Sequence, residues 1–196
     1  MEHKKYSQGL EFSTRGMFPG RCAVVGFGTN TDSNLVIPPE DPDGNKVVLV
    51  SRLGSRDEGV AAKVETVELP NSLETIGIDA FAGFRRIETI TVPDAVTRIC
   101  MGAFRDCTAL REIEFGENTT RTKGADGCFW GCKSLERVAF HGNIDGLADL
   151  MFAECANLKE VHLKHPVDMG ESVFAGCPDD PTIIFDANTD SEMEFM

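Results

Sequence analysis

The stretch IGIDAFAGFRRIETITVP (Ile76 to Pro93) is followed by ICMGAFRDCTALREIEF (Ile99 to Phe115), which repeats its pattern of apolar and polar positions. The same pattern returns in GCFWGCKSLERVAF (Gly127 to Phe140), in LMFAECANLKEVHL (Leu150 to Leu163) and in a last copy that begins at Ser172. One phenylalanine anchors each copy, at intervals of 23, 25, 23 and 22 residues. The anchors are Phe81, Phe104, Phe129, Phe152 and Phe174. Five copies in register indicate a repeat architecture.

Each repeat predicts one coil of a solenoid. Its Ile-x-Val pair alternates with polar residues, which is the pattern of a half-buried strand. Pro70 and Pro93 then end the strands, because proline cannot donate to a β-ladder. The Ala-Phe-x-x-Cys segment is too short for a full helix and predicts a helical or 3-10 turn. One repeat cannot bury its apolar face alone, so the coils must stack, with one parallel sheet face at a strand spacing of about 4.8 Å.

A second aligned position, three residues after each anchor, is mostly cysteine. The residues there are Phe84, Cys107, Cys132, Cys155 and Cys177. Phenylalanine in the first copy is neither a metal ligand nor a redox group, so the position predicts buried apolar packing, which free cysteine also provides. All seven cysteines cannot pair within one chain, which favours a reducing compartment.

The consensus L-x-x-I-x-I-P-x-x-V-x-x-I-G-x-x-A-F-x-x-C, which recurs in phase over roughly residues 47–185, resembles the BspA-type leucine-rich repeats. The resemblance implies a right-handed α/β solenoid that serves for binding, often on cell surfaces and sometimes as an adhesin. It implies a leucine-rich-repeat coil with short turns opposite its sheet.

The chain divides into three parts. Residues 1–46 form a β-rich N-terminal cap, whose short apolar runs predict β-hairpins over the first open edge of the stack. Residues 47–185 form the array of about six coils, and residues 186–196 form an acidic C-terminal tail that we expect to be frayed. Two extra residues between 116 and 127 predict a surface loop, with Arg121 and Gly124 in place of an apolar pair.

Charge and hydropathy exclude several classes of partner. The chain has 19 Lys and Arg against 32 Asp and Glu, a net charge of −13, which disfavours nucleic acids and anionic lipid surfaces. No run reaches the ~18 apolar residues of a membrane helix, so we expect no membrane insertion. Without a signal sequence the chain as given predicts a cytoplasmic protein, and removal of an upstream signal would instead place it at the cell surface or outside the cell.

No motif for catalysis, a cofactor or a metal is found. Cys128 and Cys132 lack a second cysteine pair at zinc spacing, and the loop that begins at Asp41 lacks the glycine and glutamate of a calcium loop. Glu160 and His162 share a strand face but lack further ligands. We therefore predict a protein that is not an enzyme and carries no cofactor.

The solvent face of the predicted sheet is the candidate binding surface. In a parallel stack Arg137 should lie between Glu112 and Glu160, about one strand spacing from each. This row of solvent-facing side chains either binds a ligand or forms a solvated charge ladder that keeps the sheet soluble. Its candidate contact residues are Thr89, Thr91, Glu112, Glu114, Arg137, Glu160 and His162.

Trp130, the one tryptophan, is the eighth candidate. It occupies a position that holds Ala82, Arg105, Ala153 or Ala175 in other copies, so its side chain should point outward. Exposed tryptophan is enriched in binding hot spots, although the ring could also lie over neighbouring side chains.

Two functions from different classes follow. The first is a non-catalytic, adhesin-like interaction module, a monomer or weakly self-associating, that binds a protein, peptide or glycan through its sheet face. The alternative is an intracellular structural or assembly protein that self-associates through the ends of the stack, which would give a concentration-dependent oligomer.

Overall fold

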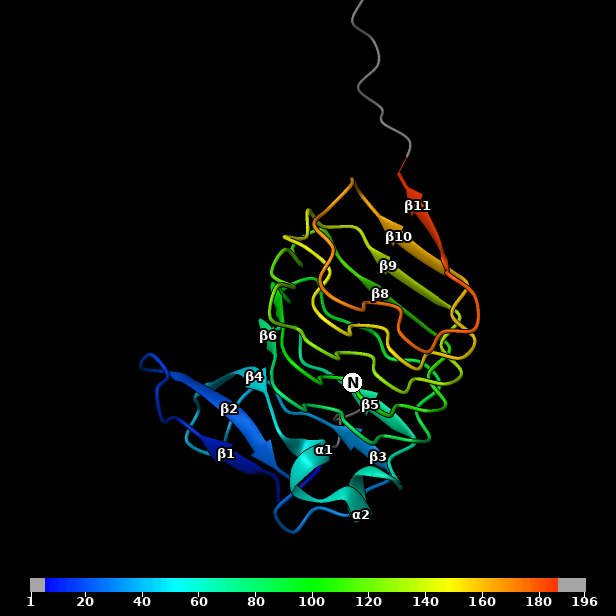
Figure 1. The fold of residues 1–196 in the computed structure, drawn as a ribbon. Coiled ribbons are helices and arrows are strands. Elements are labelled where there is room, and N and C mark those ends of the chain that lie inside the picture. Colours follow the sequence, from blue (N-terminus) through cyan, green and yellow to red (C-terminus); the bar gives the residue numbers. More distant parts are fainter. Residues whose placement is uncertain (1–5, 187–196) are drawn as a thin grey trace, which may run out of the picture.

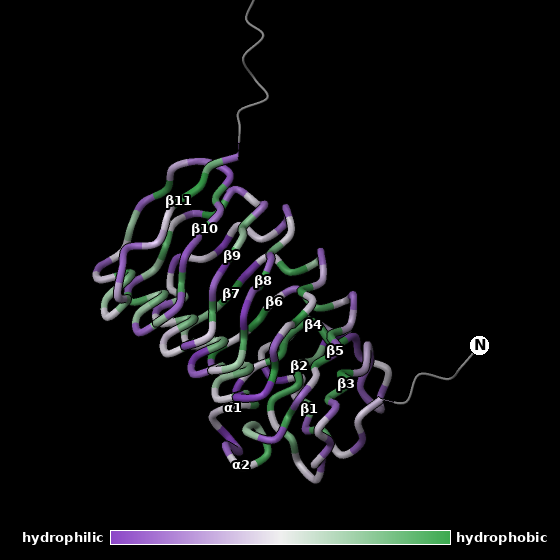
Figure 2. The backbone as a smooth tube through the Cα atoms, turned by 90° about the vertical axis from the view of Figure 1, so that its right-hand side faces the viewer, coloured by the Kyte–Doolittle hydropathy of each residue, from purple (hydrophilic) through white to green (hydrophobic). Residues whose placement is uncertain are grey.

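The computed structural model describes residues 6–186 as a single stack of coils. In Figure 1 the coils rise from the N-terminal strands and the two short helices to β11 at the far end. Figure 2 shows the same column from the side, with the coils following one another along its length. One continuous core of buried apolar residues runs from Leu10 to Val173. The predicted repeat solenoid is confirmed.

One wall of the column, here called the strand wall, carries the Ile-x-Val segments. Four of its strands pair in parallel in the order β11-β10-β9-β8, and two more pair in parallel as β3-β5. In β8, Ile113 and Phe115 point into the core while Glu112 and Glu114 face solvent, as the alternation predicts. The strands are β3 (Asn34–Val36), β5 (Thr66–Glu68), β8 (Glu112–Phe115), β9 (Arg137–Phe140), β10 (Glu160–Leu163) and β11 (Thr182–Phe185).

A second wall of strands adds to the one predicted sheet face. It forms because the short apolar segment after each proline is also extended; Ile76 and Ile99, for example, pair in parallel in neighbouring coils. The order of this sheet is β1-β2-β4-β6-β7. Its strands are β1 (Glu11–Ser13), β2 (Arg21–Gly26), β4 (Lys46–Val50), β6 (Thr75–Ile76) and β7 (Arg98–Ile99).

In the N-terminal segment β1 and β2 pair antiparallel as a hairpin, and a tight turn places Glu40 and Lys46 in a single antiparallel bridge. The prediction of hairpins is wrong for the apolar runs in β3 and β4, since β3 pairs with β5 in parallel and β4 pairs with β2 in parallel. These runs extend the solenoid instead of folding across its edge. Two short helices, α1 (Leu53–Arg56) and α2 (Glu58–Ala61), occupy the first degenerate coil.

The third wall, here called the turn wall, consists of short turns as expected, but these turns are also hydrogen-bonded from one coil to the next. The amide of Phe81 donates to the carbonyl of Ala103 in the next coil at 2.8 Å, and the amide of Gly83 donates to the carbonyl of Arg105 at 2.7 Å. Asp79 and Gly83 have φ of 48° and 72°, outside the helical region. The amides between these donors close turns within their own coil, as in the bond from the amide of Phe84 to the carbonyl of Phe81 at 3.2 Å. The segment therefore consists of single turns that are joined across the coils, and not of a helix. The amides of the later anchor residues make the same hydrogen bond to a carbonyl of the next coil. The pairs, donor first, are Phe104 and Cys128, Phe129 and Met151, and Phe152 and Val173.

The anchor phenylalanines form a continuous stack inside the column. The rings of Phe104 and Phe129 are parallel within 4°, with centroids 5.4 Å apart. Phe81, Phe104, Phe129 and Phe152 have no solvent exposure, and the ring of Phe174 completes the stack at 5.7 Å from Phe152. The predicted interior of aromatic side chains is therefore confirmed.

The aligned cysteines do more than fill space. The Sγ of Cys132 donates to the carbonyl of Phe104 in the preceding coil at 3.0 Å, and Cys155 donates to Phe129 at 3.1 Å. Cys107 and Cys177 make the same contact with Phe81 and Phe152. Burial raises the pKa of Cys132 and Cys155 well above the usual thiol value, which keeps them protonated as donors.

The coil with the two extra residues departs from the sequence-based interpretation. The apolar pair is replaced by Thr119 and Thr122, both fully buried, and not by Arg121 and Gly124. The hydroxyl of Thr119 donates to the carbonyl of Val96 at 2.8 Å, and the single proton of the Thr122 hydroxyl is shared between the carbonyl of Gly146 and Asp145 Oδ1. A buried hydroxyl is tolerated there because it has a partner.

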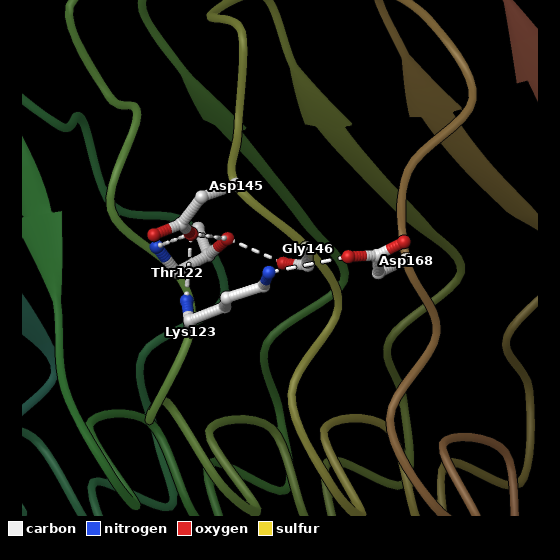
Figure 3. Close-up of polar contacts among 5 residues, drawn as sticks. All are labelled: Thr122, Lys123, Asp145, Gly146 and Asp168. Carbon is white, nitrogen blue, oxygen red and sulfur yellow. Dashed lines mark hydrogen bonds and ion pairs between the residues drawn. The ribbon is translucent and has the colours of Figure 1, made fainter.

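Asp145 ties this coil to the next one (Figure 3). Its Oδ1 accepts hydrogen bonds from the amides of Thr122 and Lys123 at 2.7 and 2.8 Å, and from the Thr122 hydroxyl at 3.1 Å. Lys123 Nζ reaches Asp168 Oδ2 at 3.2 Å in the following coil. The segment is thus held by three coils in succession.

Candidate partner-binding surface

The strand wall is interrupted between β5 and β8. Residues 88–92 keep the alternation of burial, with Ile90 and Val92 buried and Thr89 and Thr91 exposed, but they form no strand. Within the described chain, the main chain of residues 89–92 makes no hydrogen bond, and β5 and β8 are each left as the edge of a sheet. The prediction that Thr89 and Thr91 lie on a paired strand is wrong, although both side chains do face solvent.

A groove of about 490 Å³ lies where the ladder is broken, between residues 89–94 and β8. Alternate residues of a parallel strand bond to opposite neighbours. The carbonyl of Arg111 accepts hydrogen bonds at the start of β9, and the carbonyl of Phe115 accepts one just after β9 ends. The main-chain groups of Glu112 and Glu114 between them are therefore turned toward the groove. The polar side chains of the groove are Thr89, Thr91, Asp94, Glu112, Glu114 and His141.

Arg137 organises the charges at this groove. Its Nη1 lies 2.5 Å from Glu114 Oε1 and 3.8 Å from Glu112 Oε2. The hydrogen bond from Arg137 lowers the pKa of Glu114, and His141, 3.6 Å away, acts in the same direction. The side chains therefore combine two carboxylates and one guanidinium beside the hydroxyls of Thr89 and Thr91, a mixture that can both donate to and accept from a ligand.

The predicted register around Arg137 is confirmed, because Glu112, Arg137 and Glu160 are paired across β8, β9 and β10. The ion pairs are less symmetric than the register. Glu160 Oε2 lies 2.9 Å from His162 Nε2 on its own strand, while Arg137 pairs with the two carboxylates of β8. Glu160 and His162 thus extend the surface by one coil but stand apart from the groove.

Trp130 lies on the turn wall and is 44% exposed, so its side chain reaches solvent as its position in the repeat predicts. Its carbonyl accepts from the amide of Asp106 at 2.7 Å, and it is not among the residues that line the groove. The structure thus brings seven of the eight candidate residues onto one wall and leaves Trp130 on another.

His141 and a second hollow were missed in the sequence. His141 follows β9 by one residue, and its proximity to Glu114 depends on the coil register. The second hollow, about 760 Å³, lies between β5 and residues 88–91, where Arg86 pairs with Glu65 at 3.1 Å. The alternation of residues 89–92 matches that of the paired strands, so no signal in the sequence marked the broken ladder.

The described residues hold neither a group of metal ligands nor a helix that could span a membrane. Within residues 6–186, no three His, Cys, Asp or Glu side chains come together as metal ligands. In the same part of the chain, no helix has the length and apolar composition needed to cross a bilayer.

Comparison with known proteins gives one family and a set of solved folds. The family model described as the BspA type leucine rich repeat region matches residues 60–180 in six copies. No curated protein matches the sequence.

Three solved structures are similar to the chain. A leucine-rich repeat protein of T. pallidum has a TM-score of 0.70 at 22% identity, over 89% of both chains. A leucine-rich repeat protein from Bacteroides ovatus has 0.60 at 21% identity, over 89% of this chain and 51% of its own. A leucine rich cell surface protein from Faecalibacterium prausnitzii has 0.62 at 20% identity, over 93% of this chain and 54% of its own. At these identities the likeness concerns the fold, and the chain spans about half the length of the last two.

Proposed function

Because this chain belongs to the BspA-type leucine-rich repeat family, we propose that it is a non-catalytic interaction module that binds a protein, peptide or glycan through its strand wall. The observation that carries the proposal is the groove beside β8. There the side chains of Thr89, Thr91, Glu112 and Glu114 lie beside main chain, at residues 89–92, that has no hydrogen-bond partner among residues 6–186.

An extended peptide fits this groove better than a glycan does. Edge strands recognise peptides through main-chain hydrogen bonds, with alternate side chains giving specificity. The main chain of Glu112 and Glu114 is turned toward the groove, and Arg137 supplies a cation beside their carboxylates. A ligand with a polar, uncharged or mixed-charge sequence would match this surface, whereas a uniformly acidic one would meet the carboxylates.

An adhesin-like role is the finer part of the proposal. It is supported by the use of related solenoids for binding and by the cell surface description of the similar protein from Faecalibacterium prausnitzii. Under this proposal the ligand is a molecule displayed outside the cell.

The test is a selection of ligands followed by one substitution on each wall. The protein would be screened against a displayed peptide library and a glycan array, and the selected ligand would be titrated. Arg137→Glu should weaken binding about tenfold or more, because the guanidinium is lost and a third carboxylate is added. Arg105→Glu, which makes the same change of charge at an arginine of the turn wall that pairs with Asp79 at 3.4 Å, should bind like the wild type. Equal affinities for all three proteins would overturn the assignment of the site.

Self-association through the end of the stack is the second candidate, and one observation favours it. β11 is the outer strand of its sheet in the described chain, and Phe185 on it is 45% exposed. Unpaired edges with apolar side chains template pairing with another chain. Sedimentation over a hundredfold range of protein concentration distinguishes self-association from ligand binding at the strand wall. Self-association requires an oligomer that Phe185→Lys abolishes, whereas ligand binding requires no oligomer.

A further inference from the structure

A second surface lies on the wall built by β1, β2, β4, β6 and β7, away from the groove described above. The loop between β1 and β2 overhangs the outer face of the later strands and closes one side of a hollow of about 640 Å³. This hollow shares no lining residue with the groove beside β8. Its key side chains are Met17, Phe18, Leu49, Ile78, Arg98 and Arg121.

Two arginines in this hollow have no charged partner in the described chain. Arg98 and Arg121 are joined by a parallel β-bridge, so they lie side by side in neighbouring coils. Both are exposed, and neither side chain makes a hydrogen bond or an ion pair with residues 6–186. Arg21, by contrast, pairs with Glu74 at the edge of the same hollow.

The absence of a counter-charge is informative because acidic residues are abundant. The chain has a net charge of −13, and most arginines on the other two walls face a carboxylate. Like charges placed directly opposite on neighbouring strands destabilise a sheet. A pair of arginines kept adjacent and unpaired under these conditions favours an anionic ligand, and guanidinium groups match carboxylates in bidentate geometry.

The other end of the hollow is apolar. Phe18 is 78% exposed, the most exposed large hydrophobic residue of the described chain, and Ile78 is 37% exposed. Exposed aromatic side chains beside arginines are the usual composition of the centre of a protein interface. A simple anion such as phosphate would satisfy the arginines but leave Phe18 in water.

We propose that this hollow binds an extended acidic segment of a partner protein, with one aromatic or large aliphatic side chain against Phe18 and Ile78 and two carboxylates on Arg98 and Arg121. In an extended segment, alternate side chains point to one face at a spacing of about 6.6 Å. The two arginines stand about 4.8 Å apart along the column, a difference that their long side chains can span.

The probe for this site is a blocked hexapeptide with a phenylalanine and two glutamates at alternate positions and serine elsewhere. The full chain should bind it, and binding should weaken with added salt because the attraction is between exposed charges. Lysine in place of the glutamates should abolish binding, and alanine in place of the phenylalanine should weaken it about threefold or more. Failure of the wild type to bind the hexapeptide, or equal binding of the lysine peptide, would overturn the proposal.

Two variants locate the site on the protein. Arg98→Glu with Arg121→Glu should weaken binding about tenfold or more. The matched control, Arg85→Glu with Arg111→Glu, makes the same change in net charge on exposed residues elsewhere and should bind like the wild type. Phe18→Ser tests the apolar end with a side chain too exposed to matter for folding, and it should weaken binding about threefold or more. Undiminished binding by the double variant or by Phe18→Ser would contradict the site.

Cys100 supplies a direct reporter because it lines the hollow and is partly exposed. Cys177, also partly exposed, lies in the last coil and serves as the internal control. Saturating hexapeptide should slow alkylation of Cys100 severalfold and leave the rate at Cys177 unchanged. Unchanged alkylation of Cys100, or equal slowing of both thiols, would show that the peptide binds elsewhere.

Discussion

The thiol of Cys132 shows how one side chain can link two coils. Its Sγ is fully buried and donates to the carbonyl of Phe104, which also accepts from the amide of Cys107 in its own coil. The sequence predicted a buried apolar position, because Phe84 fills it in the first copy. The additional hydrogen bond could not be predicted, since it depends on the distance between two coils.

A pair of small substitutions tests this contact. Cys132→Ser keeps a donor of similar size, whereas Cys132→Ala removes it, so the serine variant should be more stable by about 1 kcal/mol. Denaturant unfolding of the two variants and the wild type measures the difference. An alanine variant that is as stable as the serine variant, or more stable, would show that the thiol acts by packing alone.

Asp145 gives a prediction about pH. Burial alone would raise the pKa of this carboxyl, but hydrogen bonds from the amides of Thr122 and Lys123 and from the Thr122 hydroxyl outweigh it, and the pKa is lowered. A carboxylate with a lowered pKa in the folded state stabilises the protein above its unfolded value of about 3.8, and that stability is lost as the pH falls through the lowered pKa.

The matching measurement compares the melting temperature of the wild type with that of Asp145→Asn. The wild type should be more stable at about pH 7, and its advantage should persist down to about pH 4 and vanish below it. Lys164→Gln, at an exposed position elsewhere, is the control for the loss of a single charge. A difference between wild type and Asp145→Asn that does not change with pH would contradict the role of the carboxylate.

At the scale of elements, the sequence predicted which segments face the core better than how their main chains pair. The alternation in Glu112–Phe115 and in residues 89–92 is the same, yet only the first is a strand. Alternation determines which side chains are buried, but whether neighbouring main chains come close enough to bond depends on the coils on both sides. The turns opposite the strand wall were expected, but their hydrogen bonds between coils were not, since Asp79 and other non-glycine residues adopt a positive φ there.

The broken ladder predicts uneven hydrogen exchange along one wall. Amides of residues 89–92 have no partner within the described chain, whereas those of β9 and β10 lie inside a parallel ladder. The amides of Thr89–Val92 should therefore exchange at least about a hundredfold faster than those of Val138 and Val161. Equal protection of these segments would mean that the strand wall is continuous in solution.

At the scale of the whole molecule, the repeat spacing predicted the column and its aromatic interior, because every copy places a phenylalanine in the same register. The candidate surface was predicted in part. The solvent-facing row was correct, but the groove and the contribution of His141 depend on contacts between coils that no single repeat encodes.

The ring of Phe104 stacks between those of Phe81 and Phe129, at 5.5 and 5.4 Å. Phe104→Ala should therefore lower the free energy of unfolding by about 3–5 kcal/mol, which is the usual cost of removing a buried aromatic side chain. Thermal or denaturant unfolding measures the loss. Exposed Phe18→Ala should leave stability unchanged, and a similar loss for both variants would contradict the buried stack.

Hydrogen exchange of the full chain with and without its selected ligand tests the proposed function most directly. The proposed function predicts that the ligand slows exchange in residues 89–92 and in Glu112–Phe115, and that the turn wall around Trp130 is unaffected. Slowing confined to the turn wall or to the end of the stack at β11, with residues 89–92 unchanged, would contradict it.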